Sequence, residues 1–148
     1  MPIDFPKTLL SPLLAVALLL SPAVAAAQTV TVYKSPTCGC CEGWVDYLRD
    51  EGFSVETIDL QNLDPIKAQY GVSPQLQSCH TALVDGYVIE GHVPVNDIRR
   101  VLDEKPDITG LTAPGMPMMS PGMASLEPRD YDVLSFDEQG NVDVYSRY

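Results

Sequence analysis

The stretch TVTVYKSPTCGCCEGWVDYL, residues 29–48, determines how the rest of the chain is interpreted. Its first part, residues 29–33, is β-branched and aromatic and predicts a strand. After a loop that holds three cysteines, apolar residues recur at helical spacing, which predicts a helix over residues 42–51. Cys38 should lie near the N-terminus of this predicted helix, where the helix dipole and free backbone amides stabilise a thiolate. The stretch therefore predicts a strand–loop–helix unit with reactive thiols at its junction.

The remainder of the chain continues this alternation of strands and helices. A strand is expected at residues 54–60, followed by a short helix at 63–70. The turn Asp85-Gly86 between two β-branched runs predicts a hairpin of strands 81–84 and 87–90. We further expect a helix at 95–102, an extended loop at 105–130 that holds five prolines, and a closing hairpin of strands 132–136 and 141–145. This order is that of a thioredoxin-like α/β fold, with a glutaredoxin-like mixed sheet flanked by helices, a Pro/Met-rich loop and a C-terminal β-hairpin.

The N-terminal segment is typical of an export signal rather than of part of the fold. Residues 9–20, LLSPLLAVALLL, follow Lys7 and precede Ala25-Ala26-Ala27, which is the charged, apolar and small-residue order of a signal peptide. The run is too short to span a bilayer as a stable helix, although an uncleaved anchor is the alternative. We expect cleavage after Ala27 and an exported protein. Its parts would be a thioredoxin-like domain at 28–104 that holds the candidate site, the Met/Pro-rich loop packing on that site at 105–130, and the hairpin at 131–148.

The charge of the chain excludes two classes of partner. With 9 Lys and Arg against 20 Asp and Glu, the formal net charge is −11. There is no basic stripe for nucleic acid and no polybasic patch for anionic lipid. An acidic surface does attract cations, so metal ions remain candidate ligands.

The cysteines are arranged for chemistry rather than for structural cross-links. Three of the four, Cys38, Cys40 and Cys41, lie within four residues, and Cys79 is distant in sequence. A bridge between Cys38 and Cys41 closes a tiny loop and removes little chain entropy, as in redox motifs. The other connectivities stay open, although a bridge between the adjacent Cys40 and Cys41 would be strained.

By analogy with glutaredoxin-like chains, we expect the fourth cysteine, Cys79, to lie at the same site. The segment SCHTALVDG occupies the place of the Val-Pro dipeptide in glutaredoxin-like chains, and His80 falls on the expected proline. That loop faces the first helix, so Cys79 and His80 should lie near Cys38. His80 is a candidate ligand or neighbour of a ligand, and His92 is a weaker candidate that we otherwise regard as a residue of the helix entry.

The methionines are as clustered as the cysteines. Apart from Met1, they are Met116, Met118, Met119 and Met123, all within GMPMMSPGM. A core would scatter its methionines, whereas these lie in a Pro/Gly loop. One interpretation is a flexible surface loop. The other is a soft-ligand loop, because thioethers and thiolates select monovalent copper and related ions.

Three segments together resemble a known family. VTVYKSPTCGCCEGWVDYLRDEGFSVE, SCHTALVDGYVIEGHVP and GLTAPGMPMMSPGM resemble the CopG-type proteins of bacterial copper-resistance systems, over about residues 30–123. The resemblance implies a periplasmic, thioredoxin-like protein with a cysteine-centred copper cluster and a suggested redox role in copper or silver handling. Its metal ligands would fall on these positions: Cys38, Cys40, Cys41, Cys79, Met116 and Met123.

Three classes of function follow from these patterns. The first is a copper-resistance protein that binds more than one Cu(I), with Cu(I)/Cu(II) redox activity, possible partners being other proteins of the same resistance system. The second is a thiol–disulfide oxidoreductase that uses Cys38 and Cys41. The third is a structural, disulfide-stapled domain. Cys40, Cys79 and the methionine loop favour the first class, because a dithiol enzyme needs only two cysteines. Zinc would suit four thiolates but leaves the methionines unexplained.

Overall fold

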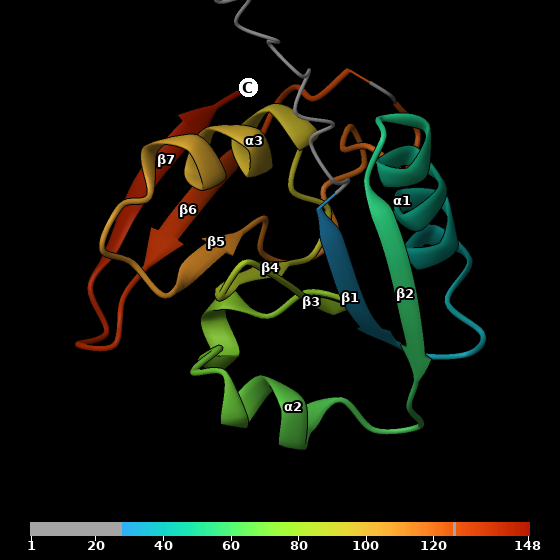
Figure 1. The fold of residues 1–148 in the computed structure, drawn as a ribbon, viewed down its shortest axis with the longest axis horizontal. Helices are drawn as coiled ribbons and strands as arrows, with labels where there is room; N and C mark the ends of the chain where they lie inside the picture. The colour runs from blue at the N-terminus through green and yellow to red at the C-terminus, as the bar shows by residue number, and fades with distance from the viewer. Residues whose placement is uncertain (1–27, 126) are drawn as a thin grey trace, which may run out of the picture.

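The computed structural model describes residues 28–125 and 127–148, and the expected signal peptide at 1–27 lies outside them. Seven strands form one mixed sheet in the order β2-β1-β3-β4-β5-β6-β7 (Figure 1). The strands are β1 (Thr29–Lys34), β2 (Ser54–Asp59), β3 (Thr81–Val84), β4 (Tyr87–Glu90), β5 (Gly110–Thr112), β6 (Asp132–Phe136) and β7 (Val142–Arg147). The helices are α1 (Gly39–Asp50), α2 (Asp64–Gln69), the 3₁₀ turn η1 (Pro74–Leu76) and α3 (Val95–Glu104).

The two faces of the sheet are covered unequally. Consecutive residues of a strand point to opposite faces, so Val88 and Ile89 of β4 belong to different cores. Ile89 lies in the larger core with Trp44 of α1 and Ile98 of α3, all fully buried. Val88 lies in a smaller core under the segment that holds α2 and η1. The predicted fold class is therefore confirmed, with α1 and α3 over the main core.

The first helix begins earlier than the sequence pattern indicates. We expected it at residue 42, but α1 begins at Gly39, with Cys38 as its N-cap residue. The backbone N–H of Cys41 points to Cys38 Sγ at 3.4 Å, so a sulfur takes the place that a Ser or Asp oxygen usually fills. Cys40 and Cys41 consequently lie in the first helical turn, where free N–H groups are concentrated.

One strand lies inside the segment that we expected to be an extended loop. Residues Gly110–Thr112 form β5, parallel to β4 and antiparallel to β6. Three residues beside several prolines are too few to show a strand pattern. This segment is a strand because it pairs with β4 on one side and β6 on the other. Its glycine is required, because a Cβ at Gly110 would lie 2.0 Å from the carbonyl oxygen of Val88. The closing hairpin, β6 and β7, thus extends the central sheet through β5.

Two contacts hold the rest of the Pro/Met-rich segment against the fold. Near its start, Ser78 and Gly115 form an isolated parallel bridge. Near its end, the backbone of Gly122 lies against α1, where a Cβ on Gly122 would be 2.5 Å from the backbone nitrogen of Trp44. Gly122 also has a φ of +84°, which glycine adopts without steric cost. The segment therefore lies across the N-terminal half of α1.

No helix among the described residues is both long enough and apolar enough to cross a membrane.

The packing of Gly122 on α1 leads to a prediction about stability. We expect Gly122→Ala to lower the free energy of unfolding by about 1–3 kcal/mol more than Gly140→Ala, because overpacking adds to the backbone strain. Gly140 is the matched control, since its φ is +82° and a Cβ added there would have no other atom within 4 Å. Equal midpoints of urea unfolding for the two variants would contradict this packing.

Candidate metal centre

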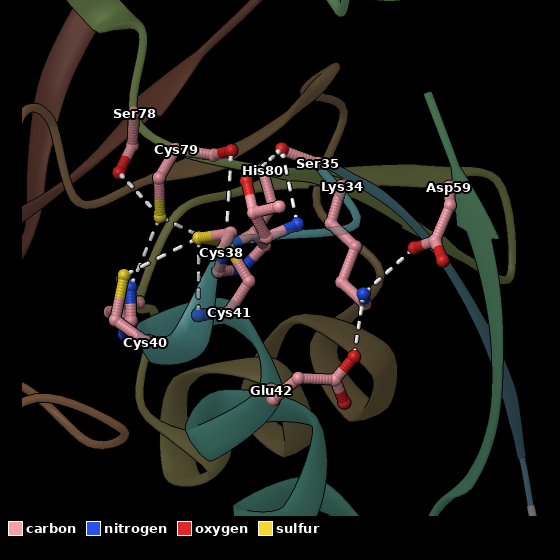
Figure 2. Close-up of a disulfide and its surroundings, with 12 residues drawn as sticks. Lys34, Ser35, Cys38, Cys40, Cys41, Glu42, Asp59, Ser78, Cys79 and His80 are labelled. Atoms are coloured by element: carbon pink, nitrogen blue, oxygen red, sulfur yellow. Dashed lines mark hydrogen bonds and ion pairs between the residues drawn. A yellow bond between two sulfur atoms is a disulfide. The ribbon is translucent and has the colours of Figure 1, made fainter. Parts of the chain in front are cut away.

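The three clustered cysteines lie at the junction of β1 and α1. Cys38 and Cys41 form a disulfide, with their Cα atoms 5.3 Å apart. Cys40 is free, and its Sγ lies 3.4 Å from Cys38 Sγ. Figure 2 shows the three side chains gathered at the first turn of α1. The helix N-terminus favours negative charge, so this position suits thiolates whenever the disulfide is reduced.

Cys79 joins these cysteines from the loop before β3, as the fold analogy predicted. The sulfur atoms of Cys38, Cys40, Cys41 and Cys79 all lie within 4.8 Å of one another. In Figure 2 the Cys79 side chain points toward the cysteines of α1. Cys79 is free, and burial followed by the nearby charge of Cys40 raises the pKa of its thiol to about 12. Four sulfurs from two chain segments thus converge on one point.

Two imidazoles complete the surroundings of Cys79. Its Sγ lies 3.2 Å from His80 Nδ1 and 3.2 Å from His92 Nε2. Both histidines are fully buried, and burial lowers the pKa of both rings, so they are neutral. The Nδ1–H of His92 donates to the carbonyl oxygen of Pro121 at 2.7 Å, which leaves the Nε2 lone pair facing Cys79. This set of one thiol and two imidazoles also lies within 4.8 Å.

His80 is packed rather than hydrogen-bonded on its far side. Its ring lies 4.5 Å from the Trp44 ring, centroid to centroid, and its Nε2 has no hydrogen-bond partner among the described residues. A buried polar atom without a partner costs free energy. Burial of His80 beside Cys79 therefore leaves its Nε2 without a hydrogen bond, which lowers the stability of the fold.

His92, the weaker of the two histidine candidates in the sequence, lies as close to Cys79 as His80 does. In the β3–β4 hairpin, Thr81 pairs with Glu90. Extending this register by two residues places residue 92 opposite residue 79. The two-residue turn Asp85-Gly86 fixes that register, so the turn itself carried the signal that His92 lies opposite Cys79.

The methionine loop, residues 115–123 (GMPMMSPGM), approaches the cysteine cluster through its backbone. Ser78 Oγ, next to Cys79, donates to the carbonyl oxygen of Gly115 at 2.5 Å, and Met116 follows directly. At the other end Met123 follows Gly122, which packs on α1. The side chains of Met116 and Met118 are exposed, whereas Met119 and Met123 are half-buried. The loop is thus anchored on both sides of the cysteines while its thioethers remain accessible.

The donor set fits a soft metal ion. Thiolates, neutral imidazoles and thioethers prefer Cu(I) and related ions over Mg²⁺ or Ca²⁺, which take oxygen ligands. The nearby cation Lys34 is already paired with Glu42 and Asp59, so it does not compete for a thiolate. While Cys38 and Cys41 form a disulfide, neither sulfur is a thiolate. Metal binding by all four cysteines therefore requires the reduced protein.

Comparisons with known proteins point in the same direction. The model of a family described as "Protein of unknown function, DUF411" matches residues 76–123. Two solved structures, titled copper resistance protein CopG, forms 2 and 1, are each 35% identical to this chain and cover 83% of it. Their TM-scores are 0.77 and 0.76, and 99% and 98% of those chains are covered. The chain belongs to the CopG family. The search of curated proteins gave no match.

Membership of the CopG family confirms the resemblance that the cysteine, Cys-His and methionine motifs indicated. The covered share, 83% of 148 residues, is comparable with the part of the chain that the structure describes. The CopG proteins that match are copper resistance proteins, and this chain has a cluster of four cysteines able to hold metal.

The raised pKa of Cys79 leads to a prediction about alkylation. In metal-free protein with the Cys38–Cys41 disulfide intact, Cys79 should be mostly a neutral thiol at pH 8, because a raised pKa favours the protonated form. We expect iodoacetamide to modify it at least about tenfold more slowly than in urea, with a rate that still rises at pH 10. Cys40→Ser should speed the reaction at high pH, since the charge of Cys40 contributes to the raised pKa of Cys79. The rate of Cys79 alkylation is measured by mass spectrometry. A rate that reaches its plateau below pH 9 would contradict the raised pKa of Cys79.

Proposed function

We propose that this CopG-family protein binds more than one Cu(I) ion in the periplasm, through the thiolates of Cys38, Cys40, Cys41 and Cys79. The observation that supports it best is the convergence of four sulfurs within 4.8 Å. Thiolate sulfur readily bridges two soft ions, so four clustered thiolates suit several Cu(I) ions better than one. The copper resistance proteins to which the chain is similar support copper as the metal, with silver as a related soft ion.

The imidazoles extend the proposed ligand set. His92 Nε2 faces Cys79 while its Nδ1–H is held by the Pro121 carbonyl, and metal-bound histidines usually donate their other N–H to such a group. His80 Nδ1 lies at the same distance from Cys79. We therefore include His92, the weaker candidate from the sequence, with His80, Met116 and Met123 in the proposed ligand set. Pro121 belongs to the methionine loop, so docking of this loop and orientation of His92 are linked.

The proposed redox activity follows from the sulfurs that the two chemistries share. Closing the Cys38–Cys41 disulfide from two thiolates releases two electrons, which an oxidant must accept, and removes two metal ligands. A copper-loaded protein would instead give up electrons from copper, which interconverts Cu(I) and Cu(II) while the metal stays bound. No other cofactor is required for this activity. Cu(I) is here the substrate or cargo, and its oxidant or reductant would be a partner of the same resistance system.

A thiol–disulfide oxidoreductase is the second candidate, because the Cys38–Cys41 disulfide lies at the N-terminus of α1. Such an enzyme has no use for Cys40, Cys79 and two buried histidines around the same point. These four residues therefore favour copper over plain disulfide exchange.

Copper titration separates these functions. The reduced protein should bind more than one Cu(I) per chain under anaerobic conditions, measured by competition with a chromophoric Cu(I) chelator. Cys40→Ser should lower the number of bound ions but leave formation of the Cys38–Cys41 disulfide intact. If Cys40→Ser retains full copper loading, or if the wild type binds one ion or none, the cluster proposal is wrong and the oxidoreductase is preferred.

The methionine loop gives an independent prediction. Replacing Met116 and Met123 by Leu keeps their volume and removes the thioether sulfurs, so Cu(I) affinity should fall about tenfold, or 1.4 kcal/mol. The melting temperature of the metal-free protein should not change, because this exchange is well tolerated. Met118→Leu is the control, since Met118 is the most exposed methionine of the loop, at 62% against 47% for Met116. Unchanged affinity in the double variant would make this segment a plain surface loop.

A further inference from the structure

A buried ion pair lies beneath the loop that carries Cys79. Glu90 ends β4 and is 0% exposed, and Lys67 of α2 is 4% exposed. Lys67 Nζ donates a short hydrogen bond to Glu90 Oε1. Burying two charges is expensive, and an apolar pair of similar volume is often as stable. The pair is thus retained at a cost, and nothing in the metal centre described above uses it.

The Glu90 carboxylate bonds to both sides of the Cys79–His80 dipeptide. Its Oε1 accepts a hydrogen bond from the backbone N–H of Ser78 at 2.7 Å. Its Oε2 accepts one from the hydroxyl of Thr81 at 2.7 Å. Lys67 Nζ also donates to Thr81 Oγ1, at 3.1 Å. One side chain therefore fixes the residue before Cys79 and the residue after His80.

The same contacts reach the methionine loop. Ser78, whose N–H is held by Glu90, is also the residue whose hydroxyl donates to Gly115. In Figure 2 Ser78 and Cys79 lie side by side above the cysteines of α1. The carboxylate thus holds the loop from which Cys79 and His80 approach the other cysteines, and the residue to which the start of the methionine loop is bonded.

The β3–β4 hairpin is held together without the Lys67–Glu90 ion pair. The β3–β4 hairpin is already paired over four residues on each strand and closed by the turn at Asp85-Gly86. The ion pair adds side-chain hydrogen bonds at the last pair of that ladder, to Thr81, and beyond it to Ser78, on either side of the proposed ligands Cys79 and His80.

We propose that Glu90, held in place by Lys67, is a positioning residue that orients the Cys79 side chain toward the other three sulfurs for Cu(I) binding. The inference rests on the proposed function, since it takes Cys79 as a ligand. It acts through hydrogen bonds to Ser78 and Thr81, and neither Glu90 nor Lys67 contacts the metal.

Two double variants separate hydrogen bonding from charge. Lys67→Met with Glu90→Leu removes the ion pair and every acceptor at position 90 while keeping the buried volume. Lys67→Met with Glu90→Gln also removes both charges, but its amide can accept from Ser78 N–H and donate to Thr81 Oγ1. We expect the Leu variant to bind Cu(I) at least about tenfold more weakly, and the Gln variant to stay within about threefold of wild type.

Asp97→Leu is the matched control for the loss of a buried carboxylate. Asp97 of α3 is 3% exposed and accepts hydrogen bonds from Ser146 and Tyr148 of the C-terminal segment, not from the cysteine centre. It should destabilise the protein without weakening Cu(I) binding below its unfolding temperature. If Asp97→Leu weakens Cu(I) binding as much as the Glu90→Leu double variant does, the effect is general instability and the proposal is overturned.

The decisive measurement is whether the effect of the Glu90→Leu double variant on Cu(I) affinity depends on the presence of Cys79. In a Cys79→Ser background the Glu90→Leu double variant should weaken Cu(I) binding by less than about twofold further, because groups that act through one another are not additive. In metal-free protein the same double variant should speed alkylation of Cys79 several-fold relative to the Gln variant. Full additivity with Cys79→Ser, or unchanged alkylation, would overturn the positioning role.

The outcomes also distinguish this inference from the proposed function. If Cys79→Ser weakens Cu(I) binding but the Glu90→Leu double variant equals wild type, only the role of Glu90 is wrong. If the wild type binds no Cu(I), the proposed function is wrong, and the alkylation rates still decide whether Glu90 orients Cys79.

Discussion

The antiparallel pairing of β1 with β3 is the constraint on which the metal centre depends. Tyr33 pairs with Thr81, so the chain that leaves β1 toward Cys38 passes the chain that enters β3 after Cys79. A slip of the register by one residue would turn Cys79 to the other face of the sheet. The core contact between Trp44 and His80 lies at the same place and fixes α1 against the β3 loop. The position of the four sulfurs is therefore a consequence of sheet register and core packing.

Much of this arrangement could be predicted from local patterns. The strand before the cysteines, the Asp85-Gly86 hairpin and the order of elements carry their own signals, and the family resemblance rests on motifs within them. β5 could not be predicted, because Gly110–Thr112 becomes a strand only between β4 and β6. The pairing of Glu90 with Lys67 joins residues 23 positions apart and has no sequence periodicity. The position of His92 beside Cys79 follows from the hairpin register, which the sequence analysis predicted but did not extend beyond the two strands.

The same sulfurs support two states of the protein. In the state described, Cys38 and Cys41 are joined, while Cys40, Cys79 and the two buried histidines remain beside them. In the reduced state four cysteine side chains would face one another near a helix N-terminus, and they would lose their protons together only where bound cations offset the repulsion between thiolates. Soft metal ions supply that positive charge and the matching ligand preference. The net charge of −11 also favours the approach of cations to the surface. Metal binding by all four cysteines and formation of the Cys38–Cys41 disulfide thus exclude each other.

The most direct test of the proposed metal centre is metal analysis of the protein after anaerobic purification, combined with a count of thiols that react with an alkylating agent. We expect more than one copper per chain, with all four cysteines protected until a Cu(I) chelator is added and all four reactive, after mild denaturation, once copper is removed. Protein that contains no copper, or that keeps the Cys38–Cys41 disulfide while holding its full copper content, would contradict it.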